Sequence, residues 1–66
     1  MSYTVRQARR MAEKSQLEAA RSIGVSLGTY CKLEKNPEKF TIAQAKTLSR
    51  LFGFSYDAIF FDSDSN

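Results

Sequence analysis

Apolar residues recur along most of this chain at intervals of three and four, which is the spacing of an amphipathic helix. No segment keeps the two-residue alternation of a β-strand, and no internal repeat is present. The helical spacing runs over residues 5–13, 16–23, 27–35, 42–52 and 56–61. The pattern therefore predicts an all-α fold, a compact domain of five short helices.

Each predicted helix has one apolar stripe that we expect to face a shared core. The expected core residues are Val5, Ala8, Met11 and Ala12, then Leu17, Ala20 and Ile23, then Tyr30 and Leu33, and finally Ile42, Ala45, Leu48 and Phe52. The pattern leaves open whether Tyr3 packs against the first helix or lies exposed.

The ends of these helices are marked by residues that cap them. Three capping boxes, in which a Ser or Thr is followed three residues later by Glu or Gln, span residues 4–7, 15–18 and 41–44. Ser26 and Ser55 can cap the third and fifth helices. Gly24 and Gly53 follow the second and fourth helices, as a left-handed C-terminal cap requires, and Pro37 ends the third.

Composition excludes several classes of function. The chain has 66 residues, the size of one small domain, with one Cys and no His. A disulfide within the chain, a zinc site of the usual kind and a Ser-His-Asp or Cys-His arrangement are therefore not expected. We accordingly expect no catalytic residue, no metal, no cofactor and no small-molecule ligand, and we do not expect an enzyme.

The chain has no segment suited to a membrane. No apolar run approaches the ~20 residues of a membrane span, and no signal peptide opens the sequence. We expect no membrane partner and a cytoplasmic location. The folded domain is expected over residues 1–61, and the polar residues 62–66 are expected to form a disordered tail.

The net charge of +3 is unevenly distributed. Residues 1–50 hold all ten Lys and Arg and four of the seven Asp and Glu, a net +6, whereas residues 51–66 hold the other three acidic residues, a net −3. A basic body favours a polyanionic partner, either nucleic acid or an acidic membrane surface. The same charge can instead serve solubility alone, and the basic residues are scattered over several helices rather than concentrated on one amphipathic face.

The segment from Gln16 to Lys35 carries the most specific signal. Two short predicted helices are joined there by only Gly24, Val25 and Ser26, and so short a turn forces the helices to cross steeply. Ala20 is expected at the crossing, where a larger side chain would hold the helices apart. This is the physical pattern of a helix-turn-helix, whose second helix projects into a DNA major groove.

Over residues 16–34 the chain reads Gln-Leu-Glu-Ala-Ala-Arg-Ser-Ile-Gly-Val-Ser-Leu-Gly-Thr-Tyr-Cys-Lys-Leu-Glu. With its Ser-Gln opening, its alanine at position 20 and its Gly-Val-Ser turn, this segment resembles the phage repressor and Cro-type (Xre-like) helix-turn-helix family. The resemblance extends over about residues 3–61, because that family also has five helices in a lambda repressor-like fold. It implies a sequence-specific regulator of transcription that binds double-stranded DNA, often as a homodimer, in the cytoplasm of a bacterial host or at its nucleoid.

The same resemblance implies a role for particular residues of this chain. Those expected to face the DNA bases are Leu27, Gly28, Cys31 and Lys32. Those expected at DNA phosphates are Ser15, Gln16, Thr29, Lys35, Asn36 and Lys39. Arg9 and Glu34 are expected to form a structural ion pair.

The chain departs from the family where bases are read. Family members typically carry Gln, Arg, Asn or Ser where this chain has Leu27 and Gly28, and neither of these offers a side-chain hydrogen bond. Direct readout would then rest on Lys32 and on apolar contact with a thymine methyl group. Cys31 is expected to be a small filler on the outer face of its helix rather than a redox switch, since no second cysteine could resolve it.

Several other residues have two readings. Arg6, Arg9, Arg10, Lys14 and Arg21 can contact phosphates or form a solvated face, and we expect about half of these five to touch nothing in a complex. Phe60 and Phe61 cannot both point inward from one helical turn, so the outward one is a candidate contact for a second chain.

Two functions therefore compete. The first is a small DNA-binding regulator of phage or prophage type, Cro-like and dimeric, that blocks polymerase at an operator. The second is a protein-binding modulator, an anti-repressor or co-repressor, that keeps the fold but uses it on a partner repressor. The apolar start of the third helix, at Leu27 and Gly28, favours the second function, whereas the lysines favour the first.

Overall fold

The computed structural model describes residues 2–60, and within that range every regular element is a helix, which confirms the predicted all-α fold. The elements are α1 (Val5–Met11), α2 (Gln16–Ser22), α3 (Leu27–Lys35), the short 3-10 helix η1 (Pro37–Lys39), α4 (Ile42–Phe52) and α5 (Tyr56–Phe60). The expectations for Phe61 and for the tail, residues 62–66, lie outside the described residues.

The capping residues form the hydrogen bonds that their spacing predicts. Thr4, Ser15 and Thr41 each accept from the backbone N–H three residues on, and the side chain at that position accepts in return from the cap's own N–H. Gly24 follows α2 with φ +72°, and Gly53 follows α4 with φ +77°. Because glycine adopts positive φ without strain, both helices end where the sequence indicated.

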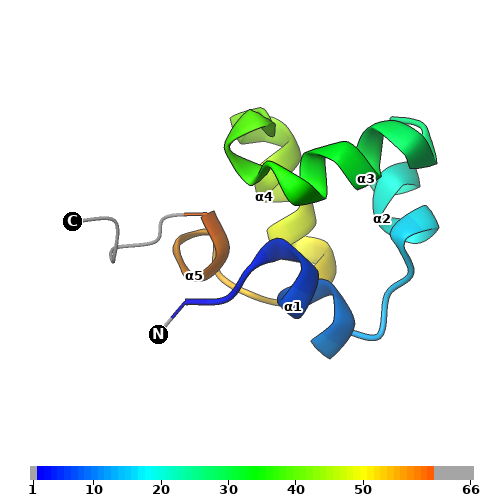
Figure 1. The fold of residues 1–66 in the computed structure, drawn as a ribbon. Coiled ribbons are helices and arrows are strands. Elements are labelled where there is room, and N and C mark those ends of the chain that lie inside the picture. Colours follow the sequence, from blue (N-terminus) through cyan, green and yellow to red (C-terminus); the bar gives the residue numbers. More distant parts are fainter. Residues whose placement is uncertain (1, 61–66) are drawn as a thin grey trace.

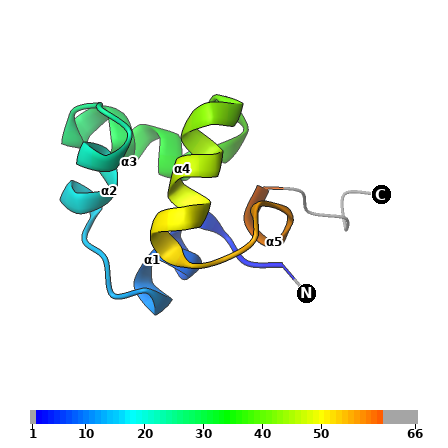
Figure 2. The same cartoon turned by 180° about the vertical axis from the view of Figure 1, so that it is seen from behind.

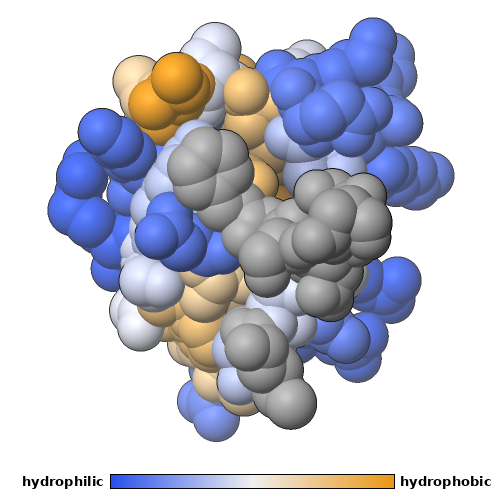
Figure 3. All heavy atoms as spheres, turned by 90° about the vertical axis from the view of Figure 1, so that its left-hand side faces the viewer, coloured by the Kyte–Doolittle hydropathy of each residue, from blue (hydrophilic) through white to orange (hydrophobic). Residues whose placement is uncertain are grey.

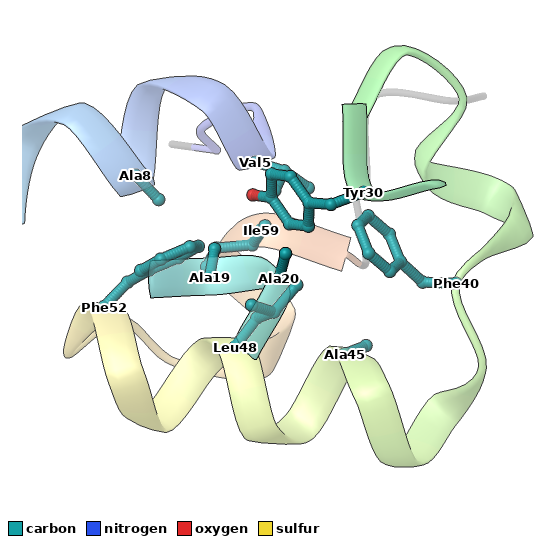
Figure 4. Close-up of a cluster of buried hydrophobic side chains, with 10 residues drawn as sticks. All are labelled: Val5, Ala8, Ala19, Ala20, Tyr30, Phe40, Ala45, Leu48, Phe52 and Ile59. Atoms are coloured by element: carbon teal, nitrogen blue, oxygen red, sulfur yellow. The ribbon is translucent and has the colours of Figure 1, made fainter. Parts of the chain in front are cut away.

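Within residues 2–60 the helices α1 to α5 pack around one core, and Figures 1 and 2 show their arrangement from opposite sides. α2 lies against both α3 and α4, while α1 and α5 cover the other end of α4. Side chains from all five α-helices and from the loop before α4 converge in Figure 4. The buried hydrophobic residues are Val5, Ala8, Ala19, Ala20, Tyr30, Phe40, Ala45, Leu48, Phe52 and Ile59.

Three residues expected in the core lie at the surface instead. Leu17 is 43% exposed, Met11 59% and Ile42 66%. The buried side of α2 runs between Ala19 and Ala20, and Leu17 stands about 110° around the helix from it. Met11 and Ile42 are the last residue of α1 and the first of α4, so both lie where packing against neighbouring helices ends.

The first helix is also shorter than predicted. α1 ends at Met11 rather than at residue 13, and Glu13 adopts the left-handed conformation with φ +59°. Its N–H donates to the carbonyl of Arg10, which closes the last turn. A left-handed residue at a helix end is usually glycine, so a glutamate at this position gave no signal in the sequence.

The start of the chain is tied to α5. The backbone N–H of Tyr3 donates to the carbonyl of Ala58 at 2.8 Å, and the Tyr3 ring meets that of Phe54 edge to face at 5.0 Å between centroids. The Phe60 ring packs against Phe40 and Tyr56 at 5.6 Å from each. Tyr3 is therefore half-buried rather than fully exposed, and its ring packs against Phe54, just before α5.

Candidate nucleic-acid interface

The turn between α2 and α3 is built by backbone hydrogen bonds around Gly24. The N–H of Gly24 donates to the carbonyl of Arg21, and the N–H of Val25 donates to that of Ala20. This pair of bonds is the Schellman motif, which requires the left-handed residue that glycine supplies. Ala20 is fully buried beneath the turn, so α3 leaves the turn already packed across α2.

One face of α3 is held in the core and the opposite face is open. Tyr30 is fully buried and Leu33 half-buried. Because successive residues are about 100° apart around a helix, Gly28, Lys32 and Lys35 lie on the opposite side, and all three are exposed. α3 runs along the edge of the molecule in Figure 1, with α2 and α4 on its inner side.

The four residues expected to face bases differ in their exposure. Leu27 is 45% exposed, Gly28 and Lys32 are exposed, and Cys31 is half-buried. Leu27 is the first residue of α3, and Ser26 caps the helix by accepting from the N–H of Thr29 at 3.1 Å. The outer face of α3 therefore begins with an apolar step, Leu27–Gly28, and continues with two lysines.

Glu34 joins α1, α2 and α3. Its Oε2 accepts from Arg9 Nε at 2.8 Å and from the Tyr30 hydroxyl at 2.7 Å, and its Oε1 accepts from Gln16 Nε2 at 3.0 Å. Arg9 and Glu34 thus form the ion pair that the family resemblance implies, with 11% and 6% of their side chains exposed. Arg9 Nη1 also donates to the Lys14 carbonyl at 2.9 Å, which fixes the loop after α1.

This cluster changes the acid–base behaviour of its members. Burial by itself raises the pKa of Glu34, but the hydrogen bonds from Arg9, Tyr30 and Gln16 outweigh it, so the pKa is lowered from 4.5. The hydrogen bond to Glu34 raises the pKa of Arg9, and burial together with the same carboxylate raises that of Tyr30. Glu34 is therefore a stable anion at neutral pH.

Gln16, expected at a phosphate, is held in a defined orientation. Its Nε2 donates to Glu34, while its Oε1 accepts from the Cys31 thiol at 3.5 Å. An amide nitrogen carries two N–H groups, so one remains for a further acceptor. Gln16 is also the first residue of α2, where unpaired backbone N–H groups favour an anion.

Beside Gln16 the surface forms a broad, open hollow, which we call the basic hollow. It is lined by Thr4, Arg6, Gln7, Arg9, Arg10, Gln16, Cys31, Glu34 and Lys35. The Arg9–Glu34 pair is neutral as a unit, so Arg6, Arg10 and Lys35 give the hollow a net positive charge. The hollow thus brings together two of the expected phosphate residues, Gln16 and Lys35.

For Arg6 and Arg10 the sequence left two alternatives open, a contact with a DNA phosphate or a place on a solvated face. They are four residues apart and therefore share one face of α1, while Arg9 turns inward to Glu34. That i, i+4 spacing was the signal in the sequence, but nothing there indicated that this face borders α3.

The other expected phosphate residues do not line the basic hollow. Ser15 and Thr29 are exposed, each already part of the cap at the start of α2 or α3. Asn36 and Lys39 are exposed beyond the C-terminal end of α3, and Asn36 Nδ2 donates to the carbonyl of Lys32 at 3.4 Å. Ser15 lies at the start of α2, Thr29 in the first turn of α3, and the other two residues after α3, so the four do not join one cluster.

Phe60, a candidate contact for a second chain, is half-buried against Phe40. Figure 3 shows the side of the molecule on which α5 lies, where apolar surface runs between hydrophilic margins. Within residues 2–60 no group of three His, Cys, Asp or Glu could hold a metal ion, and no helix of that range is long and apolar enough to cross a membrane.

Comparison with models of protein families gives a match. A family model described as helix-turn-helix matches residues 5–59, which is most of the chain. No curated protein and no solved structure matches. The matched range begins with α1 and ends in α5, so it contains the α2–α3 turn, the outer face of α3 and every residue of the basic hollow except Thr4.

Proposed function

The chain belongs to the helix-turn-helix family of the Xre and lambda-repressor type, a family of DNA-binding transcription regulators, and from that premise we propose that it binds an operator through α3. In this proposal α3 enters the major groove with Leu27, Gly28, Cys31 and Lys32 toward the bases. The regulator is of phage or prophage type, Cro-like, and acts in the cytoplasm as a repressor rather than as an enzyme.

The observation that carries this proposal is the open outer face of α3 next to the basic hollow. Lys32 and Lys35 lie exposed on that face, and Arg6 and Arg10 line the hollow beside its C-terminal half. A groove-reading helix needs cationic and N–H groups on its flank, because contacts with phosphates fix its register on the duplex. Gln16, with one amide N–H unused, supplies such a contact at the start of α2.

The size of the molecule supports a dimeric complex. Its longest dimension is 32 Å, whereas the half-sites of a palindromic operator lie about 34 Å apart, one helical turn of DNA. One chain can present one α3 to one half-site, so reading both requires a second copy. We propose that the α5 side, with Phe60, provides the contact between copies.

Repression by such a dimer requires only that it occupies the DNA, with no catalytic step. A dimer on an operator that overlaps a promoter occupies the surface that polymerase must bind, so its effect depends on affinity and abundance alone. Glu34 contributes by holding α1, α2 and α3 at the angles that this docking requires.

The test is binding to a labelled duplex that carries the promoter region next to the protein's own gene, compared with a scrambled duplex of the same composition, at 50 and 200 mM salt. We expect a preference for the native duplex that persists at the higher salt, with protection spaced by one helical turn. Equal, weak binding to both duplexes that disappears at 200 mM would reduce the interaction to phosphate attraction and contradict the proposal.

A second candidate function rests on the exposure of Leu27. An apolar residue beside an unobstructed Gly28 also suits packing against a protein, such as a partner repressor. In that case Leu27→Ala would abolish the complex, while Lys32→Ala and Lys35→Ala would leave it intact. DNA binding predicts the reverse order for nonspecific affinity, because the lysines supply the charge.

A further inference from the structure

Gly28 is a glycine for which the free protein offers no structural reason. Its φ is not in the positive range, unlike those of Gly24 and Gly53. A Cβ built at Gly28 would meet nothing within 4 Å, so no neighbouring atom excludes a side chain. Glycine inside a helix also destabilises it relative to alanine. The free protein therefore gives no reason for glycine here, and a bare backbone at this exposed position would let a partner approach α3 closely.

The residue before Gly28, Leu27, is also unusual for an exposed position. It is a large apolar residue, 45% exposed, at the first position of α3, next to Gly28 in the chain and about 100° from it around the helix. Because Leu27 is partly exposed, the free protein does not gain the full stabilisation that burial of a leucine side chain provides. We call the two residues the apolar step. Leu27 gives it a large apolar side chain, and Gly28 has no side chain.

The remaining groups on this face limit what the step can recognise. Lys32 is the one exposed side chain with a hydrogen-bond donor among the four base-facing residues, and the Cys31 thiol donates to Gln16 rather than outward. In the major groove thymine presents a 5-methyl group that cytosine and uracil lack, and this group is recognised by apolar contact. Leu27 and Gly28 have no side-chain hydrogen-bonding group, so they cannot recognise a base that is distinguished only by its hydrogen-bond donors and acceptors.

We propose that Leu27 and Gly28 are specificity-determining residues that read the 5-methyl group of thymine, with Leu27 packing against the methyl and Gly28 allowing the helix backbone to approach the base edge. This inference rests on the proposed function, since it assumes that α3 lies in the major groove. Lys32, one turn further along the same face, would then contact a neighbouring guanine.

The experiment uses duplexes that the full chain itself selects from a random-sequence pool. Each thymine of the selected site is replaced in turn by deoxyuridine, which removes the methyl group and keeps every hydrogen-bonding group. We expect one or two positions per half-site at which affinity falls about fourfold, the equivalent of one buried methyl group. In Leu27→Ala the same replacement should have no effect, whereas Leu27→Met, which keeps the apolar volume, should retain it.

Gly28→Ala provides a second test, in which stability and DNA affinity should change in opposite directions. A variant that simply failed to fold could not give this result. The variant should unfold at higher temperature than the wild type, because alanine favours the helix, and yet bind the selected duplex more weakly. Met11→Ala is the matched control, since it shortens another exposed apolar residue, at the C-terminal end of α1, and should leave the uracil effect unchanged.

The outcomes separate this inference from the function on which it rests. If selection enriches no sequence, sequence-specific DNA binding is wrong and the inference fails with it. If a site is enriched but uracil replaces thymine without loss, or the loss persists in Leu27→Ala, the function stands and the methyl-reading role is wrong. A Gly28→Ala variant that binds as tightly as the wild type would overturn the close approach of the backbone.

Discussion

Glu34 is the residue on which the contacts between the first three helices converge. Its two carboxylate oxygens accept from Arg9 on α1, Gln16 on α2 and Tyr30 on α3. When one charge of a buried pair is removed, the other charge stays buried without a partner. The free energy lost is then larger than the net stabilisation that the intact pair provides. In a domain of 66 residues, whose total stability is small, this cluster matters more than any exposed ion pair.

We therefore expect Glu34→Gln to lower the free energy of unfolding by about 3 kcal/mol, because the Arg9 guanidinium stays buried without its carboxylate. Urea unfolding followed by circular dichroism measures the change. Glu38→Gln is the matched control, since that carboxylate is exposed and its loss should change stability by less than about 0.5 kcal/mol. Similar effects of the two substitutions would contradict a structural role for the Glu34 cluster.

The lowered pKa of Glu34 also predicts how stability depends on pH. Because the folded-state pKa lies below the ordinary value of 4.5, the unfolded chain binds the proton first as the pH falls. The stabilisation is therefore complete well above pH 4.5 and is lost as the pH decreases through 4.5 toward the folded-state pKa. Unfolding measured between pH 7 and pH 3 should show this decline in the wild type.

Glu34→Gln should remove most of that dependence on pH. The pKa of Glu18 is also lowered, chiefly by its hydrogen bond from the Ser15 backbone, but Glu18 is fully exposed. Glu18→Gln should therefore leave most of the decline in place. Parallel pH profiles for Glu34→Gln and the wild type would assign the dependence to other groups.

At the scale of the elements, the two helices of the helix-turn-helix depend on glycine in opposite ways. Gly24 must adopt positive φ for the Schellman turn after α2, and Gly28 lies in α3 without that need. We expect Gly24→Ala to lower the free energy of unfolding by about 1–2 kcal/mol, since a Cβ is strained in the left-handed conformation. Gly28→Ala should raise it by about 0.5 kcal/mol. Effects of the same sign, measured by urea unfolding, would contradict this assignment.

At the scale of the whole molecule, the basic hollow and the outer face of α3 should act together as the surface that meets phosphates. Each phosphate contact releases counterions, so removing one lowers the slope of log Kd against log salt concentration by about one. We expect that decrease for Lys35→Ala and for Arg10→Ala, both of which line the hollow.

Lys46→Ala serves as the control for that measurement, because Lys46 is an exposed lysine of α4 that does not line the hollow. It removes the same charge and should leave the slope unchanged. Equal changes in all three variants would mean that net charge alone governs binding and that the hollow has no special role.

Much of this architecture follows from local sequence. The three capping boxes, the glycines at 24 and 53 and the apolar spacing act within one or two turns of helix, so they predict element type and most element ends. The end of α1 was missed because a glutamate there adopts the left-handed conformation. The family resemblance added the Arg9–Glu34 pair, which joins residues 25 positions apart and has no local signature.

The sequence by itself determined where the helices start, where most of them stop and that the α2–α3 turn is tight, because those features depend on neighbours along the chain. Only the tertiary structure decided that Leu17 and Ile42 are exposed, since burial depends on which helices face each other. It also decided that Gln16 and Cys31 meet, and that Arg6 and Arg10 border α3. Those placements arise from the crossing of α1, α2 and α3 around Glu34, a three-dimensional arrangement that no single segment specifies.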